Sequence, residues 1–205
     1  MIINHFGLTC FRIQTATAAL LIDPLEKNAG LELPRMQNDI ILYSRAAIFA
    51  KIASDKTFII SSPGEYEIKD IFIYGLPATG EQDNGTIFFI QAEGLSIAHL
   101  GLIKNPKLTA EQTEILEDVD ILMVPVGGGE SLSFKQAAEI VNDLEPRLVI
   151  PMYYQLPNLK VKLEPLDKFK REIGAKAETV DKLKINKKDL PQEETKIVIL
   201  QNNVA

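Results

Sequence analysis

The pattern of apolar runs and turn residues changes once along this chain, near residue 105, and this change constrains the fold more than any other feature. Before it, short apolar runs are separated by tight-turn sequences such as Asp83-Asn84-Gly85 and Glu93-Gly94, which is typical of β-hairpins. The Ala-rich stretch Arg45–Ala53 predicts one short helix among them. The expected strands are Phe11–Thr15, Ala18–Ile22, Asp39–Tyr43, Phe58–Ser61, Glu67–Tyr74, Ile87–Gln91 and Ser96–Leu100.

After residue 105, helices alternate with strands. Helices are expected at Thr109–Glu117 and Ser133–Leu144, because each opens with a capping box in which Gln112 or Gln136 follows the cap residue by three positions. The other elements are strands at 120–126, 147–151 and 196–201, a Gly127-Gly128-Gly129 loop, a helix at 164–173 ended by Gly174, and a Lys-rich loop at 176–191. Hairpins followed by β–α units predict an α/β sandwich, and no linker divides it, so we expect one domain over residues 1–205.

Composition limits the chemistry that such a sandwich can perform. The 205 residues include two histidines, His5 and His99, and a single cysteine, Cys10, so neither an internal disulfide nor a Cys-rich zinc site can form. The net charge of −6 disfavours nucleic acid as a partner. Because the chain also has no apolar run of membrane-spanning length and no signal-peptide pattern, we expect a cytoplasmic protein with neither nucleic-acid nor membrane partners.

Residues 160–188 differ in charge from the rest of the chain, because they hold ten Lys or Arg residues and five Asp or Glu residues. A segment of this kind is either a solvated helix and loop or a basic face for an anionic partner. Both interpretations are compatible with the sequence.

Seven short segments, taken in order along the chain, carry a family likeness. They are HFGLTCFRI (5–13), LLIDPL (20–25), DIILYSRAAIFA (39–50), SSPGEYEIKDIFIYGLP (61–77), GLSIAHLGLI (94–103), VDILMVPVGGG (119–129) and EPRLVIPMYY (145–154). In this order they resemble the metallo-β-lactamase fold superfamily, in the compact branch that includes ascorbate-6-phosphate lactonase-like hydrolases. The resemblance implies a four-layer αββα sandwich and Zn-dependent hydrolysis by a metal-bound water at the mouth of the sandwich.

The positions at which that family binds its metal have changed in this chain. Where the family has histidine or aspartate, the resemblance places Leu8, Arg45, Ala47, Phe49, Ala50, Leu102 and Tyr153, and only His99 matches. Alanine, phenylalanine and leucine offer no donor to a metal, and a protonated arginine repels cations. Since zinc needs at least three protein donors, we expect neither a metal nor any other cofactor.

If the fold holds, Arg45, His99 and Tyr153 lie close together in the former metal pocket, and they are the candidate ligand-binding residues. Their positive charge and hydrogen-bond donors would favour a phosphate, a sulfate or a carboxylate. Alternatively, the apolar replacements close the pocket, and His99 is then a buried, hydrogen-bonded residue instead of a general base. We expect closure, because four of the replacements, Ala47, Phe49, Ala50 and Leu102, are apolar and could fill the pocket, whereas only Arg45 is charged.

These observations favour a non-catalytic binding or interaction protein, a pseudoenzyme on a hydrolase scaffold. Its partner would be a small anion or another protein, and a homo-oligomer is compatible with the sequence. The alternative is a hydrolase of small substrates, phosphorylated ones among them, related to the Zn-dependent lactonases. Cys10 has no evident base beside it, so we expect a buried, unreactive thiol.

Overall fold

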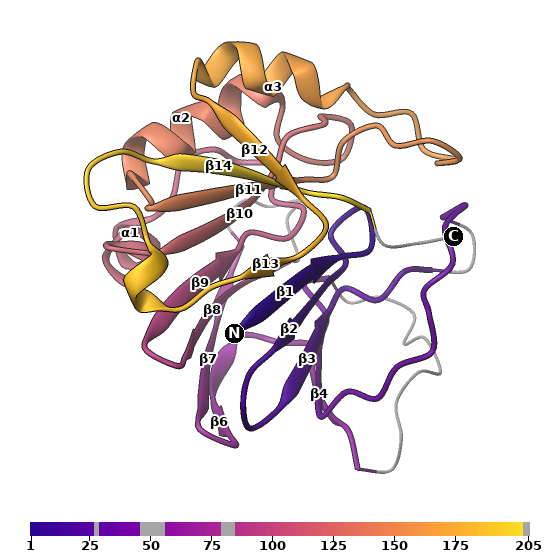
Figure 1. Ribbon diagram of the computed structural model, residues 1–205, viewed down its shortest axis with the longest axis vertical. Helices are drawn as coiled ribbons and strands as arrows, with labels where there is room; N and C mark the ends of the chain where they lie inside the picture. Colours follow the sequence, from indigo (N-terminus) through magenta and orange to yellow (C-terminus); the bar gives the residue numbers. More distant parts are fainter. Residues whose placement is uncertain (27–28, 46–55, 79–84, 203–205) are drawn as a thin grey trace.

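The computed structural model describes residues 1–26, 29–45, 56–78 and 85–202. Two β-sheets face each other, and three α-helices lie on the outer side of one of them (Figure 1), so the expected α/β sandwich is confirmed. The six-stranded sheet has the order β13-β1-β2-β3-β4-β5 and consists of β1 (Ile2–His5), β2 (Phe11–Gln14), β3 (Ala19–Ile22), β4 (Ile40–Leu42), β5 (Phe58–Ile60) and β13 (Leu183–Lys184).

The eight-stranded sheet is mixed, as the change of sequence pattern predicts. It has the order β12-β14-β11-β10-β9-β8-β7-β6 and consists of β6 (Gly64–Ile68), β7 (Ile71–Pro77), β8 (Thr86–Ala92), β9 (Leu95–His99), β10 (Ile121–Pro125), β11 (Leu148–Met152), β12 (Ala177–Val180) and β14 (Lys196–Leu200). The hairpin strands β6 to β9 pair in antiparallel fashion. The strands from β9 to β12 pair in parallel, which is the arrangement that β–α units produce.

The helices begin and end where local chemistry favours it. Thr109 caps α1 (Ala110–Leu116) and Ser133 caps α2 (Phe134–Leu144), each in the predicted reciprocal bond with a glutamine. The third helix, α3 (Leu166–Ile173), ends at Gly174, whose φ of 64° is the left-handed conformation that glycine adopts without a steric penalty.

Apolar side chains fill three layers. The inner faces of the two sheets pack together around residues such as Phe11, Phe88 and Ile97, and the helices cover the other face of the eight-stranded sheet with residues such as Phe169. Among the described residues, the outer face of the six-stranded sheet packs against Leu25, Leu31 and neighbouring residues without regular secondary structure. Within these ranges no helix is both long and apolar enough to cross a membrane.

Two expectations about strands need correction. The segment 67–74 is not one strand, because Lys69 and Asp70 both adopt positive φ and form a tight turn between β6 and β7. The segment 176–191 is not a loop, because it contains β12, β13 and a short 3-10 helix, Lys187–Asp189. The helix expected at 45–53, apart from Arg45, and the turn residues Asp83 and Asn84 lie outside the described residues.

Candidate functional site

The residues at the former metal positions gather at one edge of the sandwich, where strands of both sheets end. The parallel strands β3 and β4 of one sheet and β9, β10 and β11 of the other finish there. The turn between β1 and β2 closes over these strand ends. We call this the site edge, and it comprises residues 7–9, 23, 44–45, 99–102, 127–130 and 153.

His99 ends β9 and is fully buried. The Gly101 backbone N–H donates to its Nδ1 at 3.2 Å, so Nδ1 carries a lone pair and the proton lies on Nε2. Nε2–H in turn donates to the carbonyl oxygen of Thr9 at 3.0 Å. Burial lowers the pKa of His99, whereas the nearby Asp23 carboxylate and the bond to Thr9 act in the opposite direction. The imidazole is therefore neutral, with both nitrogens already engaged.

Arg45 pairs with a residue that the sequence analysis did not identify, Glu130, and the charges of both affect Tyr153. Both terminal nitrogens of Arg45 donate to Glu130 Oε2, at 3.1 and 3.2 Å, and the Arg45 side chain is 46% exposed. Burial raises the pKa of Tyr153, the Glu130 carboxylate adds to the rise, and Arg45 opposes it. The guanidinium therefore already has a counter-ion. The one feature of the sequence that could have identified Glu130 is its position in the glycine-rich loop after β10.

The structure does not join His99 to this pair directly. The link runs through the turn after β1, because the Tyr153 backbone N–H donates to the Leu8 carbonyl at 3.0 Å and His99 binds the next carbonyl, that of Thr9. Leu8 has a φ of 51° and Leu102 packs against the core between the sheets. Ala47, Phe49 and Ala50 lie outside the described residues.

His5, which the sequence did not connect to His99, is also part of this environment. Its ring stacks on Phe11 at 4.5 Å between centroids, and His99 meets the same ring edge-on at 5.9 Å. His5 Nε2 donates to the Leu8 carbonyl at 3.1 Å, and burial lowers the pKa of His5 to about 4. Cys10 is buried as expected, and burial raises the pKa of its thiol, so the thiolate required for reactivity is disfavoured.

Two glycines of the site edge pack so closely on their neighbours that neither position has room for a side chain. A Cβ added to Gly127 would collide with the Tyr153 carbonyl oxygen, and one added to Gly101 would stand 2.8 Å from Ser44 Oγ. Asp23 holds Ser44 in place by accepting from its backbone N–H at 2.7 Å and its hydroxyl at 2.6 Å. The Gly127 loop is thus a close backbone turn.

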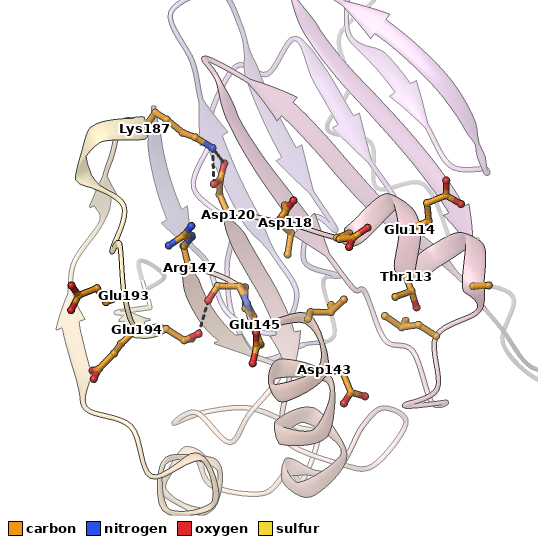
Figure 2. A pocket seen from close by; sticks show the side chains of 17 residues that line it. Thr113, Glu114, Asp118, Asp120, Asp143, Glu145, Arg147, Lys187, Glu193 and Glu194 are labelled. Atoms are coloured by element: carbon orange, nitrogen blue, oxygen red, sulfur yellow. Dashed lines mark hydrogen bonds and ion pairs between the residues drawn. The ribbon is translucent and has the colours of Figure 1, made fainter.

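Cavities open elsewhere on the described part of the molecule. Four have volumes of about 1410, 740, 410 and 90 Å³, and Arg45, His99 and Tyr153 line none of these. The largest lies at the opposite edge, where β10 and β11 begin (Figure 2). Within it, Lys187 Nζ bonds both carboxylate oxygens of the buried Asp120 at 2.8 Å. Its exposed carboxylates belong to Glu114, Glu117, Asp118, Asp143, Glu145, Glu193 and Glu194.

The site edge does not fit the metal that the family resemblance implies. Among the residues that the structure describes, no three His, Cys, Asp or Glu side chains approach closely enough to hold a metal ion. The one matching ligand, His99, uses both nitrogens for bonds to backbone groups. We therefore derive no catalytic step through a metal at this edge.

Comparison with known proteins gives a consistent relationship. A family model described as a beta-lactamase superfamily domain matches residues 2–153. Proteins of Pyrococcus horikoshii and Thermococcus kodakarensis, both named metal-dependent hydrolases, are each 28% identical to the chain, over 152 and 149 residues. Each alignment covers 69% of this chain, which spans 65% of the length of either relative.

Solved structures agree with this relationship. A Thermotoga maritima protein, described as a candidate Zn-dependent hydrolase of the metallo-β-lactamase superfamily, superposes with a TM-score of 0.83 at 26% identity, over 98% of this chain and 99% of that one. A metallo hydrolase of Ignicoccus hospitalis shares the fold at 19% identity and a TM-score of 0.63, over 84% and 90% of the two chains. The chain belongs to the metallo-β-lactamase superfamily.

Proposed function

We propose that this chain is a non-catalytic binding or interaction protein built on the metallo-β-lactamase fold. The observation that supports this most is the tight packing of the site edge, where Gly127 lies against the Tyr153 backbone and Gly101 against the Ser44 side chain. A hydrolase needs a cleft in which a substrate reaches a nucleophile and a group that stabilises developing charge. Here the imidazole of His99 is buried and fully hydrogen-bonded, so it is poorly placed to act as a general base.

A protein partner suits this arrangement better than a small anion. Glu130 already neutralises Arg45, the fixed positive charge that anion binding at this edge would use. A second copy of the chain is one partner of this kind. Light scattering at increasing protein concentration would detect it as a rise in molecular mass.

The names of the relatives favour a second candidate, a hydrolase of small substrates, phosphorylated ones among them. Two relatives at 28% identity are named metal-dependent hydrolases, and the Thermotoga maritima protein is described as a candidate Zn-dependent hydrolase. Because a shared fold supports many activities, these names support the candidate by kinship. It would need a reactive centre beyond the described site-edge contacts.

Hydrolysis assays separate the two candidates. The purified protein would be tested on a phosphomonoester, a phosphodiester and a lactone, each with and without added Zn²⁺ or Mn²⁺. We expect no turnover above the rate in buffer. Turnover that requires added metal and disappears with EDTA would establish the hydrolase and overturn the non-catalytic proposal.

A thermal-shift experiment separates a protein partner from a small anion. Phosphate and acetate would be added to the native protein, to Arg45→Ala and to Glu130→Gln, which frees the guanidinium. We expect no anion-dependent stabilisation of the native protein. Stabilisation that is present in the native protein and absent in Arg45→Ala would identify the site edge as an anion site.

A further inference from the structure

We propose that His99 is a metal-independent cross-link between the two sheets, held in the Nε2–H tautomer, and that the site edge of this chain takes no divalent metal ion. The proposal concerns the cofactor and the architecture of the edge. It stands whether the protein binds a partner or catalyses a reaction without a metal.

Both nitrogens of the His99 imidazole already take part in hydrogen bonds. A neutral imidazole has one N–H donor and one lone pair, and a metal ligand must present a lone pair to the ion. The Gly101 N–H occupies the lone pair of His99 Nδ1 at 3.2 Å. The Nε2–H group faces the Thr9 carbonyl at 3.0 Å. A metal at either nitrogen would have to displace a backbone group from the core.

The bond from His99 to Thr9 connects the two sheets. His99 belongs to the eight-stranded sheet, whereas Thr9 lies between β1 and β2 of the six-stranded sheet. The bond therefore joins the two sheets at the edge where the family resemblance places a metal ion. The ring is also wedged against Phe11 of β2, with 5.9 Å between centroids.

Two backbone hydrogen bonds join the sheets beside His99. Tyr153 N–H donates to the Leu8 carbonyl at 3.0 Å, and Thr86 N–H donates to the Ser44 carbonyl at 2.6 Å. Both bonds also run from the eight-stranded sheet or its loops to the six-stranded sheet or its loops. Hydrogen bonds within the chain thus connect the two sheets at the place where a metal ion with ligands from both sheets would otherwise connect them.

The groups around the imidazole are closely packed and already hydrogen-bonded. Gly101 has a φ of 61°, and a Cβ there would stand 2.8 Å from Ser44 Oγ, so this turn packs directly on Ser44. Asp23, the carboxylate whose charge acts against the lowering of the His99 pKa by burial, already accepts hydrogen bonds from the backbone N–H and the hydroxyl of Ser44. The donors that could complete a coordination sphere are therefore bonded to the protein itself.

Nuclear magnetic resonance of the native protein tests the tautomer directly. Long-range ¹⁵N–¹H correlation spectra distinguish a protonated ring nitrogen from an unprotonated one, and the chain has two histidines, so a His5→Gln variant assigns both. We expect His99 to show Nε2 protonated and Nδ1 unprotonated at pH 7, with no change when one or more equivalents of Zn²⁺ are added. An Nδ1–H tautomer, or a Zn²⁺-dependent shift of the His99 nitrogens, would overturn the proposal.

Metal analysis and melting temperature give an independent readout. Protein purified without chelator should contain well under one equivalent of zinc, iron or manganese, and EDTA should leave the melting temperature unchanged. One equivalent of metal that is lost in His99→Phe would refute the proposal.

Two variants measure the cross-link. His99→Phe keeps a ring but leaves the Thr9 carbonyl and the Gly101 N–H without partners, so we expect the melting temperature to fall by about 5 °C or more. His99→Gln keeps an amide N–H and a carbonyl oxygen and should recover part of the loss. Equal melting temperatures for native protein and His99→Phe would contradict a cross-linking role.

These outcomes are distinguishable from those of the proposed function. Metal-independent hydrolysis would overturn the non-catalytic proposal and leave the His99 cross-link intact. Zn²⁺ bound at His99 without any turnover would do the reverse.

Discussion

The Phe11 ring lies between the only two histidines of the chain, and both imidazoles are buried in the core. Each donates Nε2–H to a carbonyl of the same turn, His5 to Leu8 and His99 to Thr9. A buried, hydrogen-bonded His99 was foreseeable from its apolar neighbours. Its partner was not, because a backbone carbonyl in a turn leaves no signature in the sequence.

The low pKa of His5 predicts a loss of stability in acid. In the folded protein the pKa of His5 is about 4, against 6.5 for an unperturbed histidine. Between these two pH values, His5 therefore binds a proton in the unfolded chain but not in the folded protein. The stabilisation is complete above pH 6.5 and is lost as the pH falls towards 4. It amounts to about 3 kcal/mol, and urea unfolding at pH 7 and pH 4.5 would measure most of it.

The matched comparison is His5→Gln, which retains a hydrogen-bond donor and does not titrate. Asp39 and Glu93, whose carboxyl pKa values are lowered by hydrogen bonds with Lys69 and the N-terminal ammonium respectively, also lose stabilisation in acid, but they do so equally in both proteins. The native protein should therefore lose more free energy of unfolding than His5→Gln between these two pH values. Identical losses would show that His5 titrates normally.

Helices and strands differ in how well the sequence predicted them. The capping boxes at Thr109 and Ser133 depend on residues three positions apart, so the starts of α1 and α2 were predictable from local chemistry. β12 and β13 were missed, because they lie within a Lys-rich segment and become strands only by pairing with β14 and β1. Such long-range partners override local propensity.

The cap of α2 provides a test at this scale. Ser133→Ala removes the acceptor for the Gln136 backbone N–H and should lower the free energy of unfolding by about 1 kcal/mol. Urea unfolding followed by circular dichroism would measure it. Ser133→Thr, which retains the hydroxyl, should lose much less. A loss of equal size in both variants would assign the effect to packing instead of capping.

The anchor of the 3-10 helix Lys187–Asp189 provides another test. Lys187 is 59% exposed, but its Nζ is bonded to Asp120, whose side chain is 6% exposed. Lys187→Gln leaves that buried carboxylate without its cation and should cost about 1–3 kcal/mol in chemical denaturation. The exposed neighbour gives the control, because Lys188→Gln removes the same charge and should change stability by less than about 0.5 kcal/mol. Equal effects would contradict the anchor.

At the scale of the whole molecule, the two-sheet architecture was predictable from the sequence, but the order of the last strands in the eight-stranded sheet was not. The sequence order of hairpins and β–α units indicated a sandwich, but it did not indicate that β14 lies between β11 and β12. Likewise, the changes at Arg45 and Tyr153 predicted a lost metal site, whereas the glycine-rich loop before Glu130 did not indicate that Glu130 pairs with Arg45.

The position of β14 predicts the effect of truncation. A chain ending at residue 175 lacks β12, β13 and β14, so the fully buried strand β11 becomes an exposed edge. We expect this chain to be poorly soluble and to show no cooperative thermal unfolding by circular dichroism. A chain ending at residue 202 should unfold like the 205-residue chain. Cooperative unfolding of the shorter chain would show that its first 175 residues suffice for the core.

The pairing of β1 with β13 also bears on how the protein is made. Ile3 lies opposite Leu183, so 180 residues of chain separate the two partners. At a synthesis rate of about 5–20 residues per second, roughly 10–40 s pass on the ribosome between the emergence of one and of the other. During that interval the outer side of the first strand has no neighbour. A factor that shields nascent β-strands would therefore have its longest opportunity to act at the beginning of this chain.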